Sequence, residues 1–103
     1  MTRLILHPEV DAEVEESADY YESRREGYGE KFRAAVEESL EFIRSQPKAS
    51  SMYKRSTVRR RIVSKPFRYG IYYVERDEAI VVLAVMNQRR EPDYWMDRLK
   101  DLN

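Results

Sequence analysis

The 103-residue sequence has no cysteine and a single histidine, His7. These absences exclude a disulfide framework, a thiolate metal site, a cysteine nucleophile and a metal centre built from several histidines. We therefore expect neither a metal nor a cofactor. The longest apolar run, Ala79 to Met86, has eight residues, whereas a membrane-spanning helix needs about 20. The apolar start of the chain is too short for a signal peptide, so we expect a cytoplasmic protein without membrane contact.

The charges balance overall but divide unequally between the two halves of the chain. Residues 1–50 carry 7 basic and 12 acidic side chains, whereas residues 51–103 carry 12 basic and 7 acidic ones. Between Lys54 and Arg68 there are seven basic residues and no acidic one. This segment indicates either a surface for an anionic partner or a sheet edge that charge keeps soluble, and the pattern leaves both open.

The first half predicts one strand and two helices. Alternation over Arg3–Leu6 favours a short strand, and Pro8 suits the first turn of the helix that follows. The turn Gly27–Gly29 separates this helix from a second one, expected from about Glu30 to Ser45. Apolar residues recur every three or four positions along both helices: Val10, Val14, Tyr21, Phe32, Val36, Leu40 and Ile43. The pattern is typical of an antiparallel helix pair that buries one side of each helix.

The second half predicts three strands. Alternation over residues 58–63 puts Arg60 on one face of the first strand, and Arg59 and Arg61 on the other. In the next strand, the row Phe67, Tyr69, Ile71 and Tyr73 fits a core face packed on the helices. Residues 79–86 are apolar on both faces, which marks a central strand. A tail from Pro92 to Leu102 is expected to form one or two helical turns, docked by Trp95 and Leu99.

This order of elements predicts a two-layer α+β fold. We expect a single domain over residues 1–103 with a β-α-α-β-β-β arrangement. The helix hairpin packs on one face of a mainly antiparallel sheet, and a short helical tail ends the chain.

The order and spacing of several short motifs resemble the RelE/ParE superfamily of toxins from type II toxin–antitoxin systems, closest to members called plasmid stabilisation proteins. The motifs are, in chain order, His7-Pro8, Tyr20-Tyr21-Glu22, Gly27-Tyr28-Gly29 with Phe32, Arg60 in its arginine-rich strand, Phe67-Arg68-Tyr69 with Ile71-Tyr72-Tyr73, Val82-Leu83-Ala84-Val85, Arg89-Arg90-Glu91-Pro92, and Tyr94-Trp95 before Arg98. The resemblance covers nearly the whole chain. Two positions depart from it, because members commonly have His where this chain has Asn87 and Pro where it has Arg68.

The resemblance implies a growth-arresting toxin, and one hypothesis is a ribosome-linked mRNA endoribonuclease. Cleavage by the 2′-hydroxyl needs a base, cations around the phosphorane and an acid. Arginine suits the second role because its planar fork grips phosphate. The candidate catalytic residues are Arg60, Arg61, Arg68, Asn87, Arg90 and Tyr94, and the candidate nucleic-acid or partner-binding residues are Lys54, Arg59, Lys65, Tyr72 and Arg89. However, Asn87 does not titrate, and Lys and Tyr have reference pKa values of about 10.

A second hypothesis is that the chain, like ParE-type members, blocks DNA gyrase through protein contacts without a nucleolytic step. This needs no acid or base, and a pI of about 6.6 fits poorly with strong nonspecific RNA binding. A third is an attenuated or inactive member, motivated by Asn87. The density of arginines slightly favours RNA.

All three hypotheses imply a cognate protein antitoxin as partner. We expect its C-terminal segment to lie over the groove of the helix hairpin and the basic sheet face. Its acidic residues would meet Arg59–Arg61 or Arg89–Arg90, and we expect oligomers only through this complex.

Overall fold

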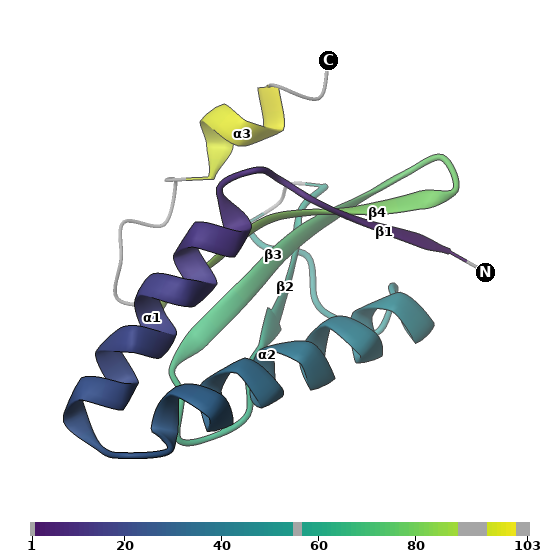
Figure 1. Ribbon diagram of the computed structural model, residues 1–103. Coiled ribbons are helices and arrows are strands. Elements are labelled where there is room, and N and C mark those ends of the chain that lie inside the picture. The colour runs from purple at the N-terminus through teal and green to yellow at the C-terminus, as the bar shows by residue number, and fades with distance from the viewer. Residues whose placement is uncertain (1, 55–56, 89–94, 101–103) are drawn as a thin grey trace.

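Four strands and three helices make up the computed structural model, which describes residues 2–54, 57–88 and 95–100. The elements are β1 (Arg3–Leu6), α1 (Val10–Arg24), α2 (Tyr28–Ser45), β2 (Arg59–Ile62), β3 (Tyr69–Arg76), β4 (Ala79–Asn87) and α3 (Met96–Lys100). In Figure 1, α1 and α2 form a hairpin beside the sheet, and α3 lies near the start of α1. The predicted α+β fold is confirmed. Within the described ranges, every helix is too short or too polar to cross a bilayer.

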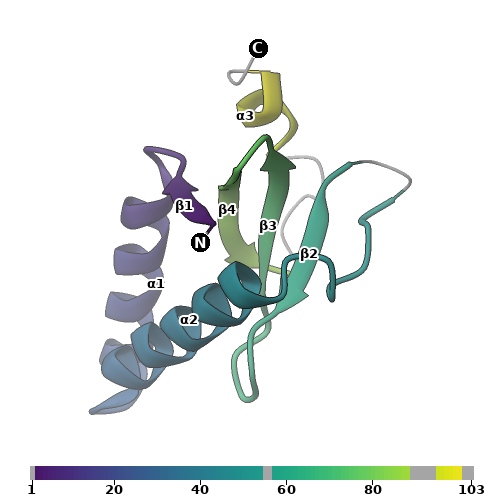
Figure 2. The same cartoon turned by 90° about the vertical axis from the view of Figure 1, so that its right-hand side faces the viewer.

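The sheet has the strand order β1-β4-β3-β2. The strand β1 runs parallel to β4, whereas the β4–β3 and β3–β2 pairs are antiparallel. The central position of β4 explains why its residues are apolar on both faces. Figure 2 shows both long helices on one side of this sheet, while the segment that follows α2 passes the β2 edge.

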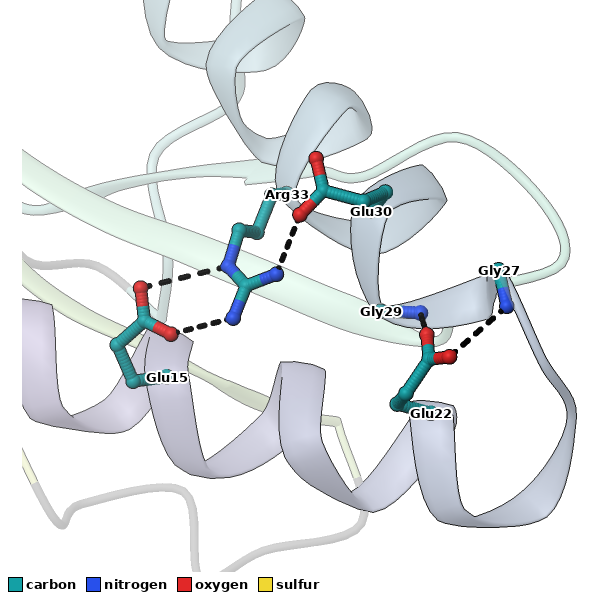
Figure 3. A network of polar contacts seen from close by, with 6 residues as sticks. All are labelled: Glu15, Glu22, Gly27, Gly29, Glu30 and Arg33. Atoms are coloured by element: carbon teal, nitrogen blue, oxygen red, sulfur yellow. Dashed lines mark hydrogen bonds and ion pairs between the residues drawn. The ribbon is translucent and has the colours of Figure 1, made fainter.

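The turn between the two long helices is held by one carboxylate, that of Glu22 (Figure 3). It accepts hydrogen bonds from the backbone N–H groups of Gly27 (3.1 Å) and Gly29 (3.0 Å). Gly27 has a φ of +86°, and a Cβ at Gly29 would lie 2.9 Å from the carbonyl oxygen of Ala18. Each glycine is therefore required for its own reason, one by backbone conformation and the other by close helix approach. The two backbone donors also lower the pKa of the Glu22 carboxyl below its usual value.

A second contact in the hairpin joins α1 to α2 through Arg33 (Figure 3). The guanidinium pairs with the carboxylates of Glu15 (2.6 Å) and Glu30 (2.7 Å). The hydrogen bond from Arg33 lowers the pKa of Glu15. The two carboxylates are exposed and the guanidinium is partly exposed, so the contact contributes little to stability.

Aromatic side chains dominate the core between helices and sheet. Tyr21 of α1 packs against Phe32 of α2, with ring centroids 5.2 Å apart, and against Phe67 at 4.9 Å. Phe32 also meets Tyr69 of β3 at 4.8 Å. Burial raises the pKa of the Tyr21 hydroxyl. The predicted core row Phe67, Tyr69, Ile71 and Tyr73 is confirmed, since all four are buried in this cluster.

The opposite face of the sheet is also covered, by Trp95 and the segment before β2. Trp95 is 3% exposed and stacks on Tyr72, with ring centroids 6.0 Å apart. Leu99 packs against the same cluster. The predicted docking of the tail through these residues is confirmed, and it buries a second apolar layer beneath α3.

An ion pair anchors α3 to α1 at the edge of β4. Because β1 pairs with β4 only as far as Val82, the described residues supply no strand beside the outer edge of Leu83–Asn87. There Arg98 donates to the Leu83 carbonyl (3.0 Å) and Glu13 accepts from the Val85 N–H (3.1 Å). The two side chains also pair with each other at 2.6 Å and are only 8% and 11% exposed. We call Glu13 and Arg98 the edge clip.

Candidate functional site

The arginines of β2 leave the strand on two different faces, because neighbouring side chains of a strand alternate. Arg60 lies opposite Tyr72, which belongs to the cluster beneath Trp95. Arg59 and Arg61 lie opposite Tyr73 and Ile71, which belong to the helix-side core. The predicted alternation is therefore correct, and the three arginines do not form one continuous surface.

Arg59 and Arg61 contact groups that belong to the fold itself. Arg59 donates to the carbonyl of Ser50 (2.6 Å) and lies 3.6 Å from the Glu75 carboxylate. The guanidinium of Arg61 lies 3.8 Å from the centre of the Phe42 ring of α2. Both side chains join β2 to neighbouring parts of the chain, and their charge is partly satisfied there.

Arg60 lies instead on a shelf of aromatic rings. Its guanidinium carbon is 4.8 Å from the centre of the Tyr53 ring, and the Lys54 ammonium is 5.4 Å from the same ring. Tyr53 meets Tyr72 edge-on at 5.2 Å and Trp95 at 6.0 Å. We call Tyr53, Lys54 and Arg60 the cationic shelf, with Tyr72 and Trp95 as its support. Two cations over one ring attract anionic groups, and the ring adds apolar contact area.

Tyr72, a predicted binding residue, is buried under this shelf with 2% of its surface exposed. Its ring is enclosed by Tyr53 and Trp95. In this arrangement Tyr72 supports the shelf and presents no ring face to a partner.

Asn87 lies on the other side of the sheet from Arg60. It pairs with Tyr69 of the helix-side core and lines a hollow of about 60 Å³ with Glu16 and Ser17 of α1. The structure therefore does not bring Asn87 and Arg60 together. Of the other predicted catalytic residues, Arg61 shares the Asn87 side of the sheet.

Lys65 and Arg68 lie together at a third place, before the start of β3. Both are exposed and line an open hollow of about 550 Å³ with Phe67 and Gln88. Its lining includes these two basic residues and several apolar ones. The remaining predicted site residues, Arg89, Arg90 and Tyr94, lie outside the described residues.

The helix hairpin has its own hollow, of about 220 Å³, between α1, α2 and the end of β1. Its apolar lining consists of Leu6, Val10, Val14, Val36 and Leu40, and its charged lining of Asp11, Glu15, Arg33 and Glu37. This is the groove over which the antitoxin was expected to lie. Three of its four charged residues are acidic, in contrast to the cationic shelf.

Tyr53 is not among the predicted site residues, and it lies between the predicted second helix and the strand predicted over residues 58–63. Its ring reaches Arg60 because the loop turns back along β2, where the Tyr53 N–H donates to the Val58 carbonyl (2.7 Å). Met52 also bridges to Arg59. The available signal was a tyrosine directly before the lysine that begins the basic segment. The contact with Arg60, however, depends on a return of the chain that no local pattern predicts.

The chain is similar to known proteins in sequence pattern and in fold. The model of a family described as the ParE toxin of type II toxin–antitoxin system, parDE, matches residues 4–92. The fold is similar to a solved structure described as the chromosomal ParDE TA system from P. aeruginosa, with a TM-score of 0.74. That likeness covers 84% of this chain and 96% of the other at 13% sequence identity, so it concerns the fold alone. No curated protein sequence matches the chain.

Proposed function

The chain belongs to the family of ParE toxins of type II toxin–antitoxin systems, and from this premise we propose that it arrests growth by binding DNA gyrase. The family implies a cognate antitoxin as partner. In our proposal the cationic shelf is the surface that contacts gyrase, and no bond is cleaved by the toxin.

The observation that carries this proposal is the separation of those candidate catalytic residues that the structure describes. RNA cleavage needs a base, a cation and an acid around a single phosphate. Arg60 lies on one face of the sheet, whereas Arg61 and Asn87 lie on the other. Arg61 in addition packs on Phe42. A toxin that acts by binding needs only a complementary surface, which this separation does not impair.

The chemistry of the shelf also suits a protein contact. Arginine and tyrosine are enriched among the residues that dominate binding energy at protein interfaces. Lys54 and Arg60 would face an acidic patch on gyrase, and such complementarity guides association and orientation. Trp95 and Tyr72 keep the Tyr53 ring in place during binding.

For the antitoxin we propose two contact areas. Its C-terminal segment would place apolar side chains in the hollow between α1 and α2, and its acidic residues would reach the cationic shelf. Covering Arg60 would then prevent the contact with gyrase. Basic residues of the antitoxin would meet the acidic lining of the hollow, at Asp11, Glu15 and Glu37.

An mRNA endoribonuclease is the second candidate, favoured by one observation. Lys65 and Arg68 are exposed and line the same open hollow, where two cations suit a phosphate. In that case substitution of Lys65 or Arg68 should relieve growth arrest more than substitution of Arg60.

The test compares purified gyrase with cellular mRNA. We expect the purified toxin to inhibit supercoiling by gyrase, while translated messages in induced cells gain no new 5′ ends. Arg60→Ala should weaken both inhibition and growth arrest. A matched control is Arg24→Ala, because Arg24 lies over the Tyr20 ring at 5.0 Å on the helix hairpin, a similar contact away from the shelf. New message ends without gyrase inhibition would overturn the proposal.

A further inference from the structure

Gly70 of β3 lies directly beneath the side chain of Arg60. A Cβ at Gly70 would be 3.2 Å from Arg60 Cδ, 3.3 Å from Arg60 Cγ and 3.2 Å from Tyr72 Cε1, all tighter than ordinary van der Waals contact. The backbone at this position does not have the positive φ that would call for glycine. Glycine is therefore needed here for space, because the absence of a Cβ lets the aliphatic part of Arg60 lie across the sheet.

Tyr53 defines where the other end of this side chain lies. The guanidinium is 4.8 Å from the centre of its ring. The ring is itself held by the backbone hydrogen bond to Val58 (2.7 Å) and by edge contacts to Tyr72 and Trp95. The aliphatic part of Arg60 therefore lies over Gly70, and its guanidinium lies over the Tyr53 ring.

Arg60 also differs from Arg59 in what holds it. Arg59 is oriented by the carbonyl of Ser50 and by the carboxylate of Glu75. Within residues 2–54, 57–88 and 95–100, no carboxylate forms an ion pair with Arg60. A ring and a steric floor leave the polar N–H donors of a guanidinium unused. A guanidinium held in this way keeps its N–H groups available to donate to a partner.

We infer that Gly70 and Tyr53 are positioning residues for Arg60, which they preorganise to take a carboxylate of the protein target. The inference rests on the proposed function, which assigns Arg60 to the target surface. A side chain already held in its bound conformation loses less entropy on binding. A planar guanidinium of fixed orientation also favours the two parallel hydrogen bonds that a carboxylate accepts.

The expected effects follow from the two contacts. Tyr53→Leu removes the ring beneath the guanidinium and should weaken inhibition of gyrase about two- to fivefold, the range of an exposed cation–π contact. Tyr53→Phe keeps the ring and should therefore retain the contact with the guanidinium. Gly70→Ala should push the Arg60 stem away from the sheet and weaken inhibition at least as much as Tyr53→Leu.

A double-mutant cycle separates positioning from general structural damage. Tyr53→Leu and Gly70→Ala are each made with Arg60 and with Arg60→Ala, and each variant is measured for gyrase inhibition, growth arrest and thermal unfolding. We expect both substitutions to weaken inhibition more with Arg60 present than with Arg60→Ala, because in that background only the contact area of the Tyr53 ring and the Tyr72 neighbour of Gly70 are still affected. Arg60→Ala removes the two Arg60 atoms that a Cβ at Gly70 would crowd and leaves Tyr72 Cε1. In this background, Gly70→Ala therefore reports the disturbance of Tyr72 alone.

Two results would overturn the inference. One is an equal loss of inhibition in both backgrounds, and the other is full inhibition by folded Tyr53→Leu and Gly70→Ala variants while Arg60→Ala is impaired. The second result leaves the proposed function intact. If the wild-type toxin does not inhibit gyrase at all, the proposed function fails. The double-mutant cycle is then evaluated by growth arrest, with the same comparison between the Arg60 and Arg60→Ala backgrounds. Should Tyr53→Leu not fold, the Gly70→Ala arm decides.

Discussion

Removing Arg98 is expected to destabilise the protein far more than removing an exposed arginine. Arg98 and Glu13 are 8% and 11% exposed, and their charged atoms are 2.6 Å apart. Arg98→Ala leaves the Glu13 carboxylate buried without its cation and removes the donor to the Leu83 carbonyl. Breaking a buried pair from one side costs about 3–5 kcal/mol. This is a large part of the roughly 5–15 kcal/mol by which small proteins are stable.

The measurement is urea unfolding followed by two signals. Circular dichroism reports the helices, and fluorescence reports Trp95, the single tryptophan of the chain, which precedes α3. In Arg98→Ala the fluorescence signal should change at lower urea than the helix signal, because α3 loses its anchor to α1. Glu13→Gln, which keeps an acceptor for the Val85 N–H, should cost less than Glu13→Ala.

The matched control is Arg33→Ala, which removes an ion pair to Glu15 between side chains that are 34% and 59% exposed. Exposed pairs contribute about 0.2–1 kcal/mol. If Arg98→Ala costs no more than this control, the edge clip does not hold the tail, and the reasoning from burial is wrong. Replacing both Glu13 and Arg98 by methionine should recover much of the loss, because no buried charge is then left alone.

Three further outcomes concern the turn between α1 and α2. Gly27→Ala should cost about 1–2 kcal/mol of unfolding free energy, since φ is +86° there. Gly29→Ala should cost about 1–3 kcal/mol of unfolding free energy, because its Cβ would lie 2.9 Å from the rigid backbone oxygen of Ala18. Equal urea midpoints for wild type and this variant would contradict the packing argument. The pKa of Glu22 is lowered in the folded state, so its contribution to stability is fully present above its unfolded pKa of about 4.3 and is lost as pH falls through the folded value. Glu22→Gln should therefore lose stability at pH 7 and little at pH 2, and an identical loss at both pH values would show that the charge plays no part.

Much of the fold follows from the sequence through short-range patterns. Alternating apolar residues predicted the core face of β3, and a run apolar on both faces predicted the central strand β4. Glycine and proline marked the ends of the helices, but α2 begins at Tyr28, two residues before the predicted start. The reason is Glu22, whose carboxylate satisfies backbone donors at the start of α2 from across the turn. A local sequence pattern does not reveal a cap that another helix supplies.

The family also follows from the sequence, because the order of motifs over nearly the whole chain resembled RelE/ParE toxins and the ParE family model matches residues 4–92. The site was predicted as a set of mainly basic residues together with Asn87, Tyr72 and Tyr94. Alternation separated Arg60 from Arg59 and Arg61, but it did not reveal that Asn87 lies on the side opposite Arg60.

Only the tertiary structure decided which of these side chains act together. The register of β3 against its two neighbours brings Arg60 over Gly70 and opposite Tyr72. The returning loop adds Tyr53, and the docked tail adds Trp95. A shift of one residue in register would turn every side chain of a strand to the other face. Such pairings between distant segments depend on packing across the whole core, so the sequence determined the elements and their cations, and the folded sheet determined the site.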